Sequence, residues 1–328
     1  MMRNPTIVRR VALVLAGYAF LIASGEAASQ GYPNKSIRLV VPNAAGGPAD
    51  GVARLIVQRL AERIGQQVVV DNRPGAGGVI GTEFVAKAPP DGYTLMWISI
   101  NHAINPSVYP KLPFDALKDF APITHATSGP LLLAVHPSVP ANDLKSLLSL
   151  ARARPGELTG ASAGSGSIAH LTVELLNYMA GTKIVHIPYK GAGQALTDLL
   201  GGHVSMYFGN VLGLLPHVRT GKLKGLAVST RSRSAAAPDI PTAAEAGVPG
   251  YEASSWFGVM APAGTPKEIV SRLNAEFVEQ LRAPDMREKL AANGTEIVAS
   301  TPEQFSSYIA SEIAKWEKVV KAAGVKAD

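Results

Sequence analysis

The chain has 328 residues, of which 47% are hydrophobic and 17% are charged. This composition excludes a disordered or collagen-like chain, and the length allows about two domains of roughly 100–200 residues each. The absence of cysteine excludes disulfides, iron–sulfur clusters, thiolate zinc sites and a cysteine nucleophile. The net charge of +6 is scattered rather than gathered in basic runs with aromatics, so we expect no nucleic-acid partner.

The N-terminus has the pattern of a secretory signal peptide. Three arginines form a basic start, and the apolar run 11–22 is too short to span a bilayer well. Small residues then lead to Ala27, the favoured cleavage point, and a retained membrane anchor is the alternative. We therefore expect a signal peptide at 1–27, cleavage near Ala27 and a mature periplasmic protein.

From residue 32 onward, short β-branched runs alternate with amphipathic stretches. A strand candidate at 37–41 is followed by a helix candidate at 50–64, where apolar residues recur every four positions, and by a strand candidate at 68–70. Further strands are expected at 95–98, 131–135, 185–187, 204–208, 226–228 and 257–260, and helices at 144–154, 168–180, 194–200 and 266–281. The pattern predicts an α/β fold, and the lack of a polar linker predicts two interleaved lobes.

Two helix starts are marked by their own sequence. Thr265 and Thr301 each precede a proline and a glutamate, which is the pattern of an N-cap followed by the first helical turn. The second of these helices carries an apolar stripe that continues to Val320. Both threonines are therefore predicted to be N-caps.

The first of three glycine-rich turns, at 42–50, leaves a strand and opens a helix. Glycine lets a ligand approach the backbone, and the free N–H groups of a helix start favour an anion. Asp50 allows three interpretations: it is the N-cap, it orients the loop, or it receives a donor from the ligand. We predict that this first glycine loop contacts a ligand.

The second glycine-rich turn, at 72–81, does not match a dinucleotide-binding pattern. Ile80 stands where G-x-G-x-x-G requires glycine, and Asp91 lies in a turn rather than at a strand end. The turn also lacks a Walker lysine. We therefore expect no nucleotide.

The third glycine-rich turn, at 160–167, contains the pattern G-x-S-x-G around Ser162. Asp198 and His217 follow in the chain order of a hydrolase triad, so a secreted serine hydrolase with Ser162 as nucleophile is the alternative function. A nucleophile elbow runs straight into its helix, however, whereas here the apolar period starts only at Ile168, with Ser167 as the expected N-cap. We favour a second anion-binding helix start in this third glycine loop.

The seven histidines show no metal-binding spacing, so we expect no metal site and no metal catalysis. His170 lies in the first turn of the helix after the third glycine loop, where it is either a ligand contact or an ordinary helix residue. Tyr189 follows a strand and either lines a cleft with its neighbours or belongs to a solvated surface.

At these residues the sequence resembles the Bug receptors, the periplasmic substrate-binding proteins of tripartite tricarboxylate transporters. The resemblance covers essentially the whole mature chain, and its specificity comes from thirteen short matches in one order. The matching segments are 32–33, 37–42, 45–47, 70–78, 89–95, 115–122, 162–171, 188–191, 196–202, 241–250, 255–258, 261–266 and 324–328.

The resemblance implies a type II periplasmic-binding-protein-like fold, with two α/β lobes that close on a small solute, no cofactor and no enzymatic turnover. The lobes would be 28–127 with 253–328, and 128–252. The family holds a ligand carboxylate through backbone amides and small polar side chains. Carried over to this chain, the ligand-binding residues are Ala45, Gly46, Gly47, Ala49, Asp50, Gly164, Ser165, Ser167, His170, Tyr189 and Asn210.

Three positions depart from the family pattern. Asn43 replaces an aromatic residue, Ala49 replaces threonine, and Gly209 replaces aspartate before Asn210. Loss of a carboxylate at 209 removes a partner for a ligand ammonium, which favours a plain carboxylate over an amino acid. The implied partners are a small carboxylate and either the membrane subunits of a tripartite tricarboxylate transporter or a sensor kinase, and the receptor is expected to be a monomer.

Overall fold

The structure is a computed structural model that describes residues 31–292 and 294–325. The predicted signal peptide at 1–27 lies outside these residues. In the part of the chain that the structure describes, no helix has the length and apolar character needed to cross a membrane.

Strands and helices alternate through most of the chain, which confirms the α/β prediction. The elements are β1 Ile37–Val41, α2 Pro48–Ile64, β2 Val68–Asn72, the 3-10 turn η1 Ala76–Gly78, α3 Val79–Ala86, β3 Thr94–Ser99, α4 Asn101–Val108, β4 Phe120–Val135, α5 Leu144–Ala153, β5 Thr159–Ser162, α6 Ile168–Ala180, β6 Val185–Pro188, α7 Ala192–Leu200, β7 Met206–Asn210, α8 Val211–Arg219, β8 Lys224–Val228, β9 Ser254–Pro262, α9 Lys267–Arg282, α10 Pro284–Ala292, β10 Glu296–Ile297 and α11 Pro302–Ala323.

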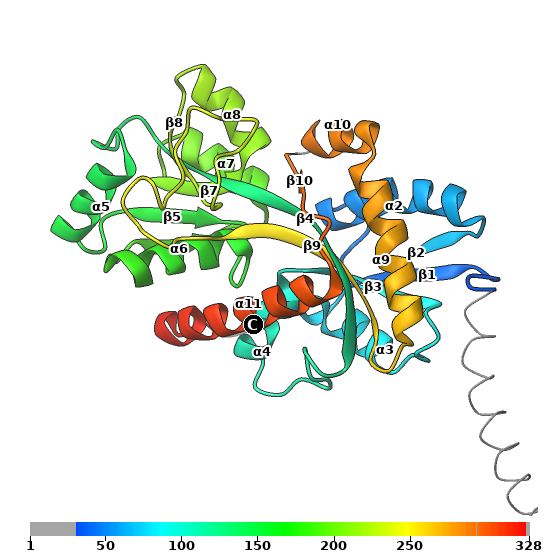
Figure 1. The fold of residues 1–328 in the computed structure, drawn as a ribbon. Helices are drawn as coiled ribbons and strands as arrows, with labels where there is room; N and C mark the ends of the chain where they lie inside the picture. Colours follow the sequence, from blue (N-terminus) through cyan, green and yellow to red (C-terminus); the bar gives the residue numbers. More distant parts are fainter. Residues whose placement is uncertain (1–30, 293, 326–328) are drawn as a thin grey trace, which may run out of the picture.

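One strand, β4, belongs to two groups of strands. The main path of the sheet runs β2-β1-β3-β9-β4-β7-β5-β6, and β8 and β10 pair with β4 outside this path. The part of β4 at 120–130 pairs with β9, and the part at 131–135 pairs with β7 and β8. Figure 1 shows β4 and β9 running between the two groups. The molecule therefore consists of two α/β lobes joined by a pair of long strands.

The two faces of the sheet are packed differently. On one face, a continuous hydrophobic core under α4, α5, α6 and α11 extends through both lobes, whereas the other face carries one cluster under α2, α9 and α10 and another under α7 and α8. Helix α11 contacts α4 in one lobe and α6 in the other. Its buried Glu312 accepts hydrogen bonds of 3.1 Å from the indole N–H groups of Trp256 and Trp316. Helix α11 therefore joins the lobes on one face.

Several local predictions are confirmed, one is wrong and one strand is longer than predicted. The helix at 168–180 has the predicted bounds, and Thr301 forms a capping box with Gln304. Thr265 is not an N-cap, because its hydroxyl donates to the carbonyl of Pro262 at 2.8 Å and the helix starts only after Pro266. The strand predicted at 131–135 is the second part of β4, whose first part contains prolines that hide a strand pattern.

Candidate functional site

The strand directions bring the first and third glycine loops to facing edges. Strand β1 is parallel to β3, which is antiparallel to β9, and β9 is antiparallel to β4, so β1 and β4 run the same way. Strand β7 is antiparallel to β4, and β5 is parallel to β7. Because β4 runs from the first lobe into the second, the carboxyl ends of β1 and β5 point toward each other. Such an edge is where open α/β sheets place their ligands.

In the first glycine loop, Asp50 orients the backbone. Gly47 is the N-cap of α2, so Asp50 stands at the third helical position and is not the cap. Its buried carboxylate accepts hydrogen bonds from the Gly46 N–H at 2.9 Å, from Arg54 Nε at 3.0 Å and from Asn72 Nδ2 at 3.0 Å. These bonds, with that from Arg54 first, lower the pKa of Asp50 to about 2. Asp50 is therefore ionised and already supplied with donors.

The remaining backbone of the first glycine loop is open to a ligand. Ala45 and Gly46 are exposed, and Ala49 is buried at the helix start. The Gly46 N–H is taken by Asp50, but the N–H groups of Ala49 and Asp50 have no acceptor among the described residues, as expected for a first helical turn. A Cβ added at Gly47 would meet only the Ala44 carbonyl oxygen, at 3.5 Å. The loop can thus offer unpaired N–H groups to an anion.

Beside Asn43, sequence reasoning missed a group of polar residues. Asn43, Ser99, Asn101, His102 and Asn105 line a small cavity with about 10 Å³ of space for the centre of a water molecule. Nε2 of buried His102 lies 2.8 Å from the Ala116 carbonyl oxygen, while its Nδ1 is buried without a partner among the described residues. The signal was available, because Ser99 ends a strand that is parallel to β1, and Asn101 follows it closely.

The third glycine loop is built from uncharged groups. Ser167 caps α6 by accepting the His170 N–H at 3.4 Å, which confirms the predicted cap. The Gly166 N–H donates to His170 Nδ1 at 3.0 Å, and the Ser167 N–H donates to the Gly164 carbonyl oxygen at 3.2 Å. His170 is buried, which together with neighbouring His186 lowers its pKa to about 4. Ser165 is exposed at the tip.

Unpaired donors remain at this loop as well. The N–H groups of Ser165, Ile168 and Ala169 have no acceptor within the described segments. The loop therefore presents N–H groups on a neutral frame, opposite the N–H groups of the first glycine loop. His170 is buried and accepts the Gly166 N–H, so it supports the loop and is more than an ordinary helix residue.

Tyr189 and Asn210 lie at the carboxyl edge of the second lobe, after β6 and at the end of β7. The Tyr189 hydroxyl donates to Asp198 at 2.7 Å. Asn210 is exposed and caps α8 by accepting the Leu212 N–H at 2.9 Å. A Cβ added at Gly294, in the other lobe, would lie 3.1 Å from Asn210 Oδ1. Asn210 therefore lies where the two lobes meet.

Packing around Gly209 leaves little room for a side chain. A Cβ added at this buried position would lie 2.5 Å from the Tyr207 ring and 2.9 Å from Leu214 Cδ1. The residue that replaces the family's aspartate is thus enclosed by its neighbours, and the edge has no carboxylate at this point.

The hydrolase alternative fails on geometry. Ser162 is fully buried and its Oγ lies 2.6 Å from His186 Nε2, not beside His217. His217 lies in the last turn of α8, and Asp198 is bonded to Tyr189. In the described segments His186 has no carboxylate partner. A buried hydroxyl that already bonds its own turn cannot attack a substrate.

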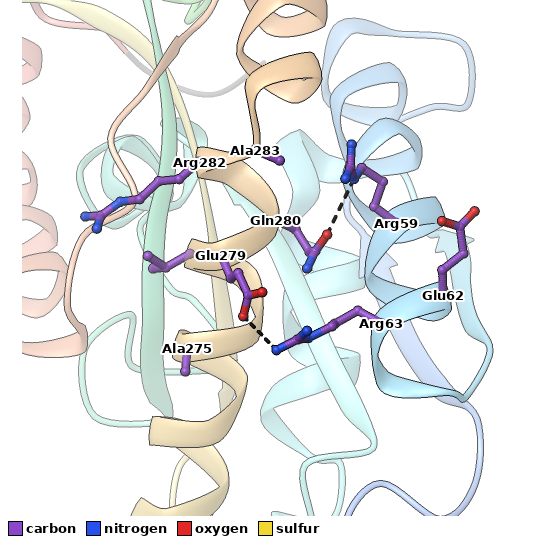
Figure 2. Close-up of a pocket in the computed structure, with 9 residues that line it drawn as sticks. Arg59, Glu62, Arg63, Ala275, Glu279, Gln280, Arg282 and Ala283 are labelled. Carbon is purple, nitrogen blue, oxygen red and sulfur yellow. Dashed lines mark hydrogen bonds and ion pairs between the residues drawn. The ribbon is translucent and has the colours of Figure 1, made fainter.

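Other surface features lie away from the two loops. A groove of about 780 Å³ between α2 and α9 is lined by Arg59, Arg63, Glu279 and Gln280 (Figure 2). Two of its arginines are in ion pairs: Arg63 Nη2 donates to Glu279 at 2.9 Å, and Arg59 pairs with Asp285. Among residues 31–292 and 294–325, no cluster of three metal-ligating side chains occurs.

Comparisons with known proteins agree with this geometry. Residues 52–325 match the model of the tripartite tricarboxylate transporter family receptor. Protein BugT from Bordetella pertussis is 41% identical over 312 residues, which cover 94% of this chain and 96% of BugT. The structure is similar to that of R. palustris Rpa4515 with adipate, at 41% identity and a TM-score of 0.75, covering 90% of this chain and 99% of that one. It is also similar to MatC from Rhodopseudomonas palustris with bound malate, at 35% identity and a TM-score of 0.71, covering 88% and 100%.

These matches confirm the predicted resemblance. They identify the chain as a solute-binding receptor and give no support to a serine hydrolase. The chain belongs to the tripartite tricarboxylate transporter receptor family.

Proposed function

We propose that the protein captures a small organic carboxylate between the first and third glycine loops and delivers it as a periplasmic receptor. The observation that carries this proposal is the pair of facing helix starts. In the described part of the chain, they offer N–H groups without acceptors at Ala49, Asp50, Ser165, Ile168 and Ala169. Backbone N–H groups at a helix start stabilise an anion through hydrogen bonds and the helix dipole. The adipate and malate bound to two relatives support the same ligand class.

We propose further that the ligand lacks an ammonium group. An ammonium needs an acceptor with spare capacity, but the Asp50 carboxylate already accepts hydrogen bonds from a backbone N–H, from Arg54 and from Asn72. Position 209 carries glycine. A plain mono- or dicarboxylate is therefore favoured over an amino acid.

Ligand capture would close the two lobes, taken as 28–127 with 253–328, and 128–252. The change of partners within β4, from β9 to β7 and β8, supports a boundary near Gly129. A carboxylate that bridges both loops binds the closed form better, and only such differential affinity shifts the equilibrium toward closure. The membrane subunits of a tripartite tricarboxylate transporter would receive the ligand, or a sensor kinase would read the closed form.

A binding panel combined with small-angle scattering tests the proposal. Adipate, malate, aspartate and glutamate are added to purified protein, and thermal shift and calorimetry record binding. We expect a plain carboxylate to stabilise the protein by about 2.7 kcal/mol at 100 times its Kd and to reduce the radius of gyration. Binding of aspartate alone, or binding without compaction, would contradict the proposal.

The exported chain is proposed to begin at Ala28 or Ser29 after signal-peptide cleavage. The intact mass of protein recovered from the periplasm tests this start. Recovery of the full-length chain in the membrane fraction would contradict it.

A further inference from the structure

Three polar side chains, Ser162, His186 and His170, contact one another beneath the third glycine loop, and the proposed function does not by itself explain them. Ser162, at the end of β5, lies 2.6 Å from His186 Nε2 on β6. The His186 ring stacks on His170 of α6, with ring centroids 3.6 Å apart and planes within 11°. Ser162 is fully buried and His170 is 7% exposed. Three elements of the second lobe thus meet directly below the loop.

The hydrogen-bonding capacity of Ser162 determines the tautomer of His186. Ser162 Oγ accepts the Gly164 N–H at 3.1 Å and lies 2.9 Å from the Gly164 carbonyl oxygen, to which only the hydroxyl can donate. A hydroxyl has one proton, so it cannot also donate to His186. All three contacts are satisfied only if His186 donates from Nε2–H to Ser162 Oγ.

His170 is restricted in the same way. Because its Nδ1 accepts the Gly166 N–H at 3.0 Å, the proton of the neutral ring is on Nε2. This nitrogen faces Glu174, at 3.8 Å. The two stacked rings therefore fix Gly164 and Gly166, which flank the exposed Ser165.

Resting on the proposed function, we propose that His186 is a positioning residue for carboxylate binding, acting through Ser162. The pair fixes both the N–H and the carbonyl of Gly164, and that carbonyl in turn accepts the Ser167 N–H at 3.2 Å. With these groups engaged, the Ser165 N–H has no acceptor among the described residues. The short serine–histidine contact therefore shapes a binding loop.

Three variants and one matched control test this role. Ser162→Ala removes the hydroxyl, His186→Phe keeps a stacked ring without a donor, and His186→Gln restores an N–H near the position of Nε2. The control, Ser205→Ala, removes a serine that accepts the Thr159 N–H at 3.1 Å near the opposite end of β5. Calorimetry uses whichever of adipate and malate the parent protein binds more tightly.

We expect Ser162→Ala and His186→Phe each to weaken binding by about three- to tenfold, as for loss of one buried hydrogen bond. A variant that combines Ser162→Ala with His186→Phe should bind no more weakly than the weaker of the two single variants, because both changes remove the same hydrogen bond. His186→Gln should recover most of the affinity, and Ser205→Ala should bind as the parent does. Equal affinities for Ser162→Ala and Ser205→Ala would overturn the proposal.

A second measurement needs no ligand. In the ¹⁵N spectrum of the unliganded parent at pH 7, both His170 and His186 should be protonated at Nε2 and not at Nδ1. Ser162→Ala should shift the amides of Gly164 and Ser165, while Ser205→Ala should not. If the parent binds neither carboxylate, the proposed function fails, and these spectra alone decide whether His186 positions the loop.

Discussion

The first and third glycine loops are held in place by different chemistry. In the first lobe, a buried ionised carboxylate, Asp50, holds the Gly46 N–H and is itself held by Arg54 and Asn72. In the second lobe, neutral groups hold the Gly164 and Gly166 N–H groups: the Ser162 hydroxyl and the His170 imidazole. Both arrangements tie down part of a glycine-rich backbone. Both also leave the N–H groups of a helix start unpaired.

This difference explains how the proposed site would attract an anion although Asp50 is ionised. Asp50 would repel a carboxylate, but the guanidinium of Arg54, with both carboxylate oxygens 3.0 Å from its Nε, compensates its charge. The second lobe adds no charge to its loop. Attraction then comes from the partial positive charge of the helix starts.

Among the substitutions, the largest loss of unfolding free energy is expected when the Asp50 carboxylate is removed. Asp50→Ala leaves the Gly46 N–H, Arg54 and Asn72 without their acceptor. Because the Arg54 side chain is half exposed and can be solvated, we expect a loss of about 2–3 kcal/mol of unfolding free energy, as for hydrogen bonds to a charged group. Urea denaturation measures this loss. The control Asp71→Ala breaks the more exposed pair with Arg73 (2.9 Å), for which we expect at most about 1 kcal/mol. Similar losses in both variants would contradict the assigned role of Asp50.

Acid should release the two loops at different pH values. The pKa of His170 is lowered from 6.5 to about 4 by burial and by His186, so the unfolded chain binds the proton first. Stability from His170 is therefore complete above about pH 6.5 and falls, by on the order of 3 kcal/mol, as the pH drops toward 4. Asp50, with a pKa of about 2 against 3.8, keeps its contribution down to about pH 4 and loses it toward pH 2.

Nuclear magnetic resonance can separate these two transitions. The Gly166 amide should titrate with a midpoint near pH 4, when protonated Nδ1 of His170 can no longer accept its hydrogen bond, and the Gly46 amide near pH 2. His170→Gln should reduce the slope of unfolding free energy between pH 4 and 6.5 by about 1.4 kcal/mol per pH unit. Coincident midpoints for both amides would remove the proposed distinction between the loops.

Adding a side chain at Gly47 tests whether the ligand contacts the backbone of the first glycine loop. Gly47 has φ −81° and ψ 172°, which any residue adopts, and an added Cβ meets only one carbonyl oxygen. Because Gly47 is the N-cap of α2, Gly47→Val should lower the unfolding free energy by at most about 1 kcal/mol. It should weaken carboxylate binding by roughly 2 kcal/mol, which is about 30-fold. Gly47→Ala should lie between the parent and Gly47→Val. Scattering should show less ligand-induced compaction in Gly47→Val, and parent-like binding would place the ligand elsewhere.

The helix starts at the two loops could be predicted from the sequence, but the hydrogen bonds that hold these loops in place could not. The strand-to-helix transitions at both loops follow from local apolar periods and glycine, so helix α6 and its cap Ser167 could be predicted. The serine–histidine contact joins residues 24 positions apart through parallel strand pairing, which local patterns do not encode. Arg54, four residues after Asp50, was a local signal that went unused.

The first half of β4 was missed for a physical reason. Prolines disrupt the strand pattern, yet Pro122 lies at a shift in the pairing register with β9, where a regular ladder hydrogen bond is not required. The same shared strand sets the direction of β1 against β5. The arrangement that brings the two loops to facing edges could therefore not be predicted, because it depends on β4, whose first half has no clear periodicity in the sequence.

The smallest effects should separate binding from support within the third glycine loop. Ser165 is exposed, and its hydroxyl has no hydrogen bond within the described chain, so Ser165→Ala should leave stability unchanged and weaken binding by about 0.5–1.5 kcal/mol through loss of one donor to the ligand. Ser167 instead caps α6, and Ser167→Ala should lower the unfolding free energy by about 1 kcal/mol as well as weakening binding. Calorimetry and urea denaturation of both variants, set beside Ser205→Ala, give the comparison. If Ser165→Ala destabilises the unliganded protein as much as Ser167→Ala does, then Ser165 supports the loop, and the unpaired backbone N–H groups alone would contact the carboxylate.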